Sequence, residues 1–145
     1  MKISQNGLNL IKEFEGLRLQ PYKCVAGKWT IGYGHTNNVN QNTRSITIEQ
    51  AEQLLKQDVE YFENLVNDES YVPQDINQNQ FDALVSFAFN LGGGNLRELC
   101  NANYPPGKKT VNHIAAEITL YNKVNKKTCQ GLVNRRKKEK ELFLS

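Results

Sequence analysis

The sequence predicts an α+β fold that is mostly helical and contains one small antiparallel β-hairpin. Apolar residues recur at helical spacing over several long segments, and a short stretch rich in glycine and aromatic residues interrupts them near the N-terminus. The chain has 145 residues, of which 39% are hydrophobic and 23% charged, and it contains no internal repeat or low-complexity linker. This size and composition are typical of one globular domain, so we expect a single domain over residues 1–145.

The N-terminal third is expected to hold a helix followed by the hairpin. Ser4 is a favourable N-cap for the apolar stripe that follows it, and Gly16 is placed to end the helix just after Glu15. From residue 18 to residue 36 the sequence becomes β-branched and aromatic around an Ala-Gly turn, which is typical of two short strands.

The rest of the chain is expected to be helical. Thr47 with Gln50 forms a capping-box pattern ahead of a long apolar stripe, and Asn77 with Gln80 repeats it ahead of a helix that should be central and buried. The expected helices cover about 47–66, 77–91, 96–101, 110–121 and 132–144, and a Tyr-Pro-Pro-Gly sequence at 104–107 separates two of them.

The net charge of +3 hides an asymmetry along the chain. Residues 1–107 carry 8 Lys or Arg and 12 Asp or Glu, which gives −4, whereas residues 108–145 carry 10 and 3, which gives +7. Such a basic segment suits a polyanion such as nucleic acid or an anionic cell wall, and it equally suits a solvated helix face. No apolar run approaches the roughly 20 residues of a membrane-spanning helix, and the polar N-terminus does not resemble a cleaved signal peptide.

The cysteines and histidines do not predict a metal site. Cys24, Cys100 and Cys129 form no CxxC pair, and His35 and His113 stand alone in the sequence. We therefore expect no metal and no cofactor. An odd number of cysteines without an export signal favours reduced thiols in a cytoplasm, with one disulfide as the alternative.

Glu15 is the first candidate for chemistry. It stands at the C-terminal end of the expected helix, where the helix dipole disfavours a carboxylate. If the hairpin folds back over this end, desolvation would raise the pKa of the carboxyl group toward the value that a general acid needs. The alternative is an ordinary exposed carboxylate beside Glu13.

A longer motif surrounds this residue. The stretches 14–16, 22–24 and 27–36 together resemble the signature of the phage-type lysozymes, the endolysins of glycoside hydrolase family 24. In that signature a Glu is followed after eight residues by Asp or Cys and after five more by Thr, which here are Glu15, Cys24 and Thr30. Two further blocks, residues 80–92 and 131–139, also resemble the family.

The resemblance implies a two-lobed, lysozyme-like fold. The hairpin lobe would cover about residues 16–46, and a long helix would connect it to a helical lobe of about residues 66–145 that includes the N-terminal helix. The resemblance also implies a lysozyme, an N-acetylmuramidase that cleaves the β-1,4 bond between N-acetylmuramic acid and N-acetylglucosamine in peptidoglycan, with Glu15 as general acid. In the inverting reaction that it implies, Thr30 helps to hold the attacking water.

Cys24 departs from the better-known phage enzymes, which carry Asp at this position. A thiol has an ordinary pKa of about 8.5, against about 3.9 for Asp, so we expect a neutral thiol at pH 7 unless the surroundings stabilise the thiolate. Cys24 could be a thiolate base, a placeholder that only fills space or forms a hydrogen bond, or a nucleophile; a small buried hydrophobe is the structural alternative. We favour Cys24 and Thr30 orienting the water together.

Three further residues are candidates for substrate binding. His35 could contact the sugar chain, or it could be a structural hydrogen-bonding residue at the end of the hairpin. Asn90 matches a position that lines the sugar cleft in the family, or it simply ends its helix before a glycine run. Arg135 matches an arginine that can pair with the catalytic Glu, or it is one more surface charge in a basic helix.

The resulting interpretation is a monomeric phage or prophage endolysin that acts on peptidoglycan and approaches the anionic envelope surface through its basic C-terminal part. It implies no nucleic acid and no stable membrane insertion, with accumulation in the host cytoplasm until a holin or another exporter releases the protein. A lytic transglycosylase giving 1,6-anhydro products is the alternative enzyme. A basic helical protein that binds nucleic acid, a non-catalytic wall-binding domain and a bacterial rather than phage owner also stay open.

Overall fold

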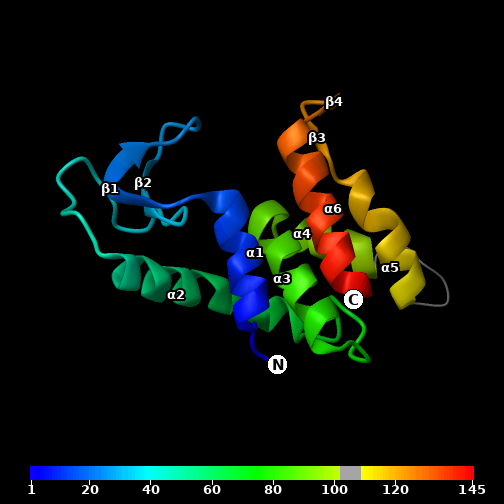
Figure 1. Ribbon diagram of the computed structural model, residues 1–145. Helices are drawn as coiled ribbons and strands as arrows, with labels where there is room; N and C mark the ends of the chain where they lie inside the picture. Colours follow the sequence, from blue (N-terminus) through cyan, green and yellow to red (C-terminus); the bar gives the residue numbers. More distant parts are fainter. Residues whose placement is uncertain (102–108) are drawn as a thin grey trace. The chain divides into compact units, whose positions relative to one another are not determined.

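The structure is a computed structural model that describes residues 1–101 and 109–145 (Figure 1), and it confirms the expected α+β class. The Tyr-Pro-Pro-Gly sequence at 104–107 lies outside the described residues. Within them, the elements in chain order are α1 (Gln5–Glu15), β1 (Arg18–Lys23), β2 (Trp29–Gly32), α2 (Ile48–Val66), α3 (Gln78–Leu91), α4 (Gly93–Cys100), α5 (Val111–Glu117), the 3-10 helix η1 (Ile118–Leu120), β3 (Lys123–Val124), β4 (Lys127–Thr128) and α6 (Gln130–Leu144).

The chain divides into two compact units. The hairpin unit comprises Ile11–Tyr61, and the helical unit comprises Met1–Leu10 together with Phe62–Ser145, so that the boundaries fall within α1 and α2. The expectation of one domain with lobes at about 16–46 and 66–145 stays a prediction. In the described part of the chain, none of the helices is both long and apolar enough to span a membrane.

The hairpin unit contains the antiparallel pair of β1 and β2. Tyr22 lies opposite Thr30 and Lys23 lies opposite Trp29, and the register is interrupted between Arg18 and Tyr22. Such an irregularity bends a strand locally and increases its twist. The hairpin expected between residues 18 and 36 is therefore confirmed.

The long helix α2 also belongs mainly to this unit and begins with the expected capping box. The Thr47 hydroxyl accepts from the Gln50 amide at 3.1 Å, and the Gln50 side chain accepts from the Thr47 amide at 2.9 Å. The apolar stripe of α2 is buried because it forms one side of the core of the unit. This core contains Ile11, Ile31, Ala51, Leu55 and Val59.

The helical unit is built around α3. Asn77 caps this helix, because its side chain accepts from the Gln80 amide at 2.9 Å while the Gln80 side chain accepts from the Asn77 amide at 2.9 Å. Residues 81–88 are all buried, since α6 and α4 both pack against α3. A helix enclosed on several sides has no room for a solvated face, which explains its apolar sequence.

Some element boundaries differ from the sequence prediction. α4 already begins at Gly93, within the glycine run expected only to end the preceding helix. Gly92 makes this possible: at φ 88° it closes α3 through a hydrogen bond to the Ala88 carbonyl and is at the same time the N-cap residue of α4. The helix expected over 110–121 is split into α5 and η1.

A second hairpin, formed by β3 and β4, is absent from the sequence prediction. Its turn residues Asn125 and Lys126 both have positive φ, 49° and 67°, as in two-residue hairpin turns. Each strand has only two residues, which is too short for an alternating apolar pattern to be recognised. The turn also carries a lysine where glycine would normally signal a hairpin, so the sequence offered no clear marker.

Candidate active site

Glu15 is the last residue of α1 and is half-buried. The helix ends here because Gly16 adopts a φ of 71°, and its backbone N–H donates to the Lys12 carbonyl at 3.1 Å. The carboxyl group therefore lies at the negative end of the helix dipole, which is unfavourable to a carboxylate. The expected position of Glu15 at the end of its helix is confirmed.

A tight turn in the hairpin unit lies against this carboxyl group. Ile31 and His35 exchange two backbone hydrogen bonds of 2.9 Å, and Gly32 and Gly34 between them have φ of 68° and 84°. A Cβ atom on Gly34 would stand 3.1 Å from Oε1 of Glu15. Glycine at position 34 therefore meets two requirements: a backbone conformation with positive φ, and room for the Glu15 carboxyl group close to the turn. Sequence reasoning did not assign Gly34 this role, although Gly32 and Gly34 are both visible in the motif.

Cys24 and Thr30, the other two expected catalytic residues, lie together on the hairpin. The Lys28 carbonyl accepts hydrogen bonds from both of them, from the Cys24 amide at 2.9 Å and from the Thr30 hydroxyl at 3.0 Å. The turn is closed by the Gly27 amide, which donates to the Cys24 carbonyl at 2.9 Å. Thr30 is buried, whereas Cys24 is half-buried, so the alternative of a fully buried hydrophobe at position 24 does not fit.

Hydrogen bonds to the sulfur lower the pKa of the Cys24 thiol. The backbone amide of Lys28 is the largest cause; partial desolvation opposes it, and the Ala26 amide and the Thr30 hydroxyl add to the lowering. A lower pKa increases the thiolate fraction at neutral pH relative to a cysteine in water. The surroundings of Cys24 therefore shift it toward the anionic character that Asp would have at this position.

His35 is engaged in a contact with α2. Its Nδ1 atom lies 2.8 Å from Oδ2 and 3.1 Å from Oδ1 of Asp58, and only 13% of the imidazole side chain is exposed. This pair joins the end of the hairpin to the long helix of the same unit. Sequence reasoning missed Asp58, because nothing local marks one acid of α2 as the partner of a residue 23 positions earlier. A contact of His35 with substrate stays a prediction.

The two remaining candidates lie in the helical unit. Asn90 is in the last turn of α3, and its Oδ1 accepts a hydrogen bond from Arg136 Nη2 at 2.8 Å. Arg135 is only 3% exposed; its Nε donates to Oε2 of Glu139 at 3.3 Å and its Nη2 donates to the Ser86 carbonyl at 3.2 Å. The alternative that Arg135 is a surface charge is therefore wrong. Its pairing with the catalytic Glu stays a prediction.

Arg135 and Arg136 belong to a buried ion-pair cluster around Glu139. Arg136 Nε lies 2.6 Å from Oε1 of Glu139, and the Ser86 hydroxyl donates to Oε2 at 2.6 Å. Positions 135 and 136 lie four and three residues before position 139, so both arginines can reach Glu139 on the face of α6 that packs on α3. The basic final helix is thus not a uniformly solvated face: two of its cations are used inside the fold.

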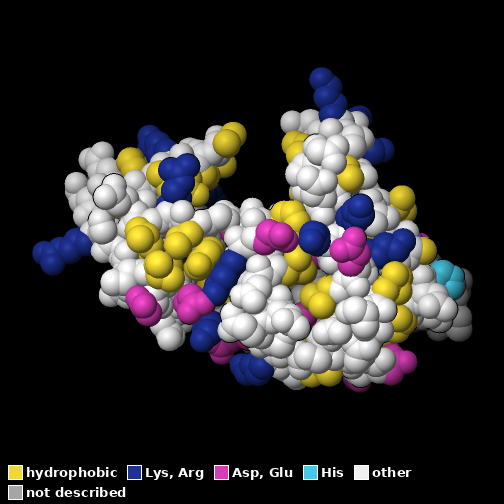
Figure 2. Space-filling view, viewed as in Figure 1, with side chains coloured by type: hydrophobic (Ala, Val, Ile, Leu, Met, Phe, Trp, Pro, Cys, Tyr) yellow, Lys and Arg dark blue, Asp and Glu magenta, His cyan; other side chains and the backbone are white. Residues whose placement is uncertain are grey.

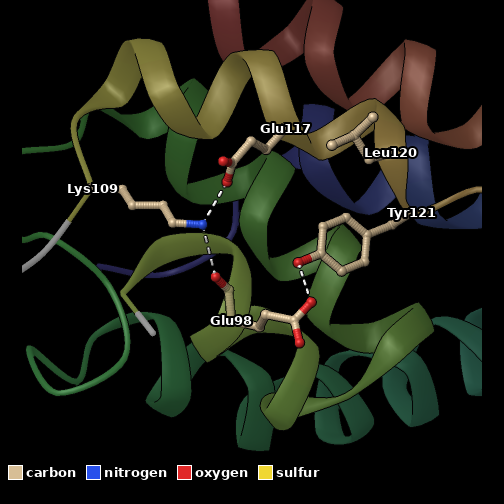
Figure 3. Close-up of a pocket in the computed structure, with 5 residues that line it drawn as sticks. All are labelled: Glu98, Lys109, Glu117, Leu120 and Tyr121. Carbon is tan, nitrogen blue, oxygen red and sulfur yellow. Dashed lines mark hydrogen bonds and ion pairs between the residues drawn. The ribbon is translucent and has the colours of Figure 1, made fainter. Parts of the chain in front are cut away.

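The helical unit also contains a polar pocket of about 330 Å³ (Figure 3). Lys109 Nζ lies 2.5 Å from Oε2 of Glu117 and donates to the Glu98 carbonyl at 3.1 Å, while the Tyr121 hydroxyl donates to Oε1 of Glu98 at 2.8 Å. Leu120 completes the lining. Lys109 is paired with Glu117, the Glu98 carboxylate accepts from Tyr121, and none of the six candidate residues lines the pocket, so we assign it no catalytic role.

The cysteines and acidic residues offer no metal centre in the described ranges. Cys24, Cys100 and Cys129 are all free thiols. Among residues 1–101 and 109–145, no three His, Cys, Asp or Glu side chains are grouped so that they could hold a metal ion.

Comparison with known proteins identifies the family. Residues 12–139 match the family model described as phage lysozyme. The chain belongs to the phage lysozyme family. Among its relatives, the endolysin of Bacillus phage PZA is 47% identical, and the alignment covers 100% of this chain and 56% of the relative. The endolysin of Salmonella phage P22 is 39% identical, and the alignment covers 100% of this chain and 99% of the relative. The chain spans about half the length of the Bacillus phage endolysins that it matches.

Solved structures agree with this family. The endolysin from Escherichia coli O157:H7 phage FAHEc1 is similar with a TM-score of 0.83 and 35% identity, covering 100% of this chain and 94% of that chain. The muramidase domain of SpmX from Asticaccaulis excentricus is similar with a TM-score of 0.82 and 36% identity, covering 99% and 98%. The lysozyme-like fold that the resemblance implied is therefore confirmed.

The family match spans all six candidate residues. Glu15, Cys24, Thr30 and His35 are located in the hairpin unit, and Asn90 and Arg135 in the helical unit. Within the hairpin unit the structure brings Cys24 and Thr30 together and sets the turn before His35 against Glu15. The catalytic and binding roles of the six residues stay predictions.

Proposed function

We propose that this member of the phage lysozyme family is a peptidoglycan hydrolase, an N-acetylmuramidase that cleaves the β-1,4 bond between N-acetylmuramic acid and N-acetylglucosamine. The observation that carries the proposal is the family match over residues 12–139, which includes Glu15, Cys24 and Thr30. The related SpmX domain is named a muramidase, and the related phage proteins are named endolysins. These names support the same substrate class for this chain.

Glu15 acts as the general acid. Its carboxyl proton passes to the glycosidic oxygen while the bond from that oxygen to the anomeric carbon breaks, which leaves an oxocarbenium-like centre on the sugar. The turn at Gly34 lies close against the carboxyl group and limits the positions that this proton donor can take. The contact that supports Glu15 as the general acid lies entirely within the hairpin unit, since Glu15 and Gly34 both belong to it.

Cys24 and Thr30 orient the attacking water. Because the Thr30 hydroxyl interacts with the Cys24 sulfur, a water bound by one group lies within hydrogen-bonding reach of the other. The oxygen of this water forms a bond to the anomeric carbon on the face opposite the leaving group, and the thiolate accepts its proton. The lowered pKa of Cys24 supports this assignment, and attack from the opposite face inverts the configuration.

The biological role that we propose is that of an endolysin. The substrate is peptidoglycan, the protein works as a monomer beside an anionic envelope surface, and a holin or another exporter releases it from the host cytoplasm. The phage origin of the named relatives supports this role. His35, Asn90 and Arg135 are proposed to contribute to substrate binding.

The experiment that tests the proposed function is mass spectrometry of the soluble fragments released from purified peptidoglycan. Wild type and Glu13→Gln, which alters an exposed neighbouring carboxylate, should release fragments with reducing-end muramic acid. Glu15→Gln should lower the rate by about 10²–10⁴-fold, because the general acid is removed. Fragments with 1,6-anhydro ends would instead assign a lytic transglycosylase, and no release by wild type would contradict a lytic enzyme of either kind.

A further inference from the structure

A cluster of exposed positive charge lies on the β3–β4 hairpin, residues 123–128, which we call the lysine hairpin. Lys123, Lys126 and Lys127 are all exposed, and Figure 2 shows Lys and Arg side chains protruding at this end of the helical unit. No Asp or Glu occurs between residues 118 and 138. Within the described residues none of these three ammonium groups forms an ion pair, so their charge is available to an external anion.

The backbone of the hairpin carries a second indication. Lys126 adopts a left-handed φ of 67°, a conformation that costs free energy for any residue with a Cβ atom and that glycine would adopt freely. A lysine at this position stabilises the turn less than glycine would. We therefore attribute its presence to the charge of its side chain. Backbone strain of this kind is concentrated at functional sites.

The pairing of the strands distributes the charge around the hairpin. Lys123 pairs with Thr128 and Val124 pairs with Lys127, and paired residues share a face whereas consecutive residues alternate. Lys123 and Lys127 therefore lie on opposite faces, with Lys126 in the turn between them. A flat membrane would contact only one face, whereas a flexible polymer can contact both. Within residues 123–128, Val124 is the single large apolar residue that could enter a lipid layer, and it is 52% exposed.

We propose that the lysine hairpin binds a flexible anionic polymer of the bacterial envelope whose repeating unit carries a phosphodiester. The inference rests on the proposed function, since a peptidoglycan hydrolase meets such polymers at its substrate. Lysine ammonium groups suit this partner because they act as point charges toward repeated phosphates and need no bidentate geometry. The affinity comes from release of counterions from the polymer, so it falls steeply with salt. The N-terminus of α6 follows the hairpin directly, and its dipole adds to the positive potential.

Two variants with the same loss of charge test the surface. In the hairpin variant, Lys123→Gln, Lys126→Gly and Lys127→Gln are combined; in the control variant, the exposed Lys56, Lys137 and Lys138 are all changed to Gln. The probe is fluorescently labelled poly(glycerol phosphate), and affinity is measured by anisotropy between about 50 and 200 mM salt. We expect the hairpin variant to bind the polymer about tenfold more weakly than wild type. The slope of log affinity against log salt should also become shallower by about 2, because each lost phosphate contact contributes about 0.7 to this slope. The control variant should bind nearly as wild type.

The single substitution Lys126→Gly separates binding from folding. It removes one charge and relieves the left-handed conformation, so affinity for the polymer should fall about twofold while the thermal midpoint stays equal or rises. A variant that merely failed to fold would lose both. Unchanged affinity of Lys126→Gly together with unchanged affinity of the hairpin variant would overturn the proposal.

Further outcomes test the identity of the hairpin's binding partner separately from the proposed hydrolase activity. Equal weakening in the hairpin and control variants would mean that only net charge matters, which overturns the assignment to the hairpin. Hairpin-dependent binding to vesicles containing phosphatidylglycerol, without binding to the polymer, would assign a lipid surface instead. Peptidoglycan stripped of anionic polymer should be cleaved equally by wild type and the hairpin variant. If wild type fails to cleave the stripped peptidoglycan, the proposed hydrolase function is wrong. The anisotropy measurement with the polymer still tests whether the lysine hairpin binds it.

Discussion

Gly34 lies against the carboxyl group of Glu15, so closely that a Cβ atom at position 34 would stand 3.1 Å from Oε1. The φ of 84° at Gly34 makes this position unfavourable for other residues even without that contact. The glycine therefore combines two requirements that are separable by experiment. One is the backbone conformation of the turn, and the other is the space that the Glu15 side chain occupies.

Gly34→Ala should lower both stability and activity. The left-handed conformation costs an alanine about 1–2 kcal/mol, and displacement of the carboxyl group by a fraction of an ångström to 1 Å should lower kcat/KM by about 10–100-fold. Gly92→Ala is the matched control, because Gly92 has a φ of 88° and nothing within 4 Å of the added Cβ. It should lose stability in urea unfolding and keep its kcat/KM. Equal activity of the two variants would show that Gly34 has only a backbone role.

The contact between His35 and Asp58 should contribute to stability. Both side chains are mostly removed from solvent, with 13% and 28% exposed, and their closest atoms are 2.8 Å apart. A double-mutant cycle with His35→Ala and Asp58→Ala should give a coupling of about 1 kcal/mol in the free energy of unfolding. If the role of His35 is structural, both single variants keep kcat/KM within about tenfold at temperatures well below their melting points. A loss confined to His35→Ala would point to substrate contact instead.

The hydrogen bond from Arg136 fixes the orientation of the Asn90 amide. Because Oδ1 accepts from Arg136, the Nδ2 group points away from it, and in the described part of the chain Nδ2 has no acceptor. Asn90→Asp keeps an oxygen toward Arg136 and removes the N–H donors. It should therefore unfold no more easily than wild type, and its KM for peptidoglycan fragments should rise about tenfold. Asn90→Ala should lose stability as well. An unchanged KM in both variants would remove Asn90 from substrate binding.

The lowered pKa of Cys24 predicts a specific pH dependence. If the thiolate is the base, the reaction needs Glu15 protonated while the Cys24 thiol is ionised, so one limb of the pH profile of kcat/KM is set by the pKa of Cys24, which lies below that of an ordinary thiol. Cys24→Asp should stay active and move this limb toward about pH 4, the range of an ordinary Asp. Cys24→Ser should lose the limb together with most of the activity. A Cys24→Ser variant with the activity and pH profile of wild type would contradict the role of the thiolate as base.

Cys100 should behave in the opposite way to Cys24. Burial raises the pKa of the Cys100 thiol to about 12, above the value of about 8.5 expected in the unfolded chain. The neutral thiol therefore favours the folded state below pH 8.5, and this contribution is lost as the pH rises toward 12. Between pH 8 and pH 10, urea unfolding of wild type should show a loss about 2 kcal/mol larger than that of Cys100→Ala. Iodoacetamide at pH 8 should modify Cys24 in the folded protein and Cys100 only after unfolding.

Features encoded by neighbouring residues were predictable from the sequence. The end of α1 at Glu15, and the capping boxes that begin α2 and α3, depend on residues within about one helical turn of each other. The hairpin of β1 and β2 was recognisable for the same reason, because glycine and aromatic residues mark it locally. The candidates Glu15, Cys24 and Thr30 came from a motif with fixed spacing, which is also a local feature.

Other features were decided only by the tertiary structure. Nothing within one turn of His35 indicates Asp58, and nothing near Arg135 and Arg136 in the sequence distinguishes two buried arginines from the solvated lysines beside them. Their burial follows from α6 packing on α3, which brings Ser86 to Glu139 across 53 positions. The sequence by itself determined where most helices begin and end, because capping and periodicity act over a few residues. Which charges are paired and which remain exposed depends on the element that covers each face, and that is a property of the folded chain.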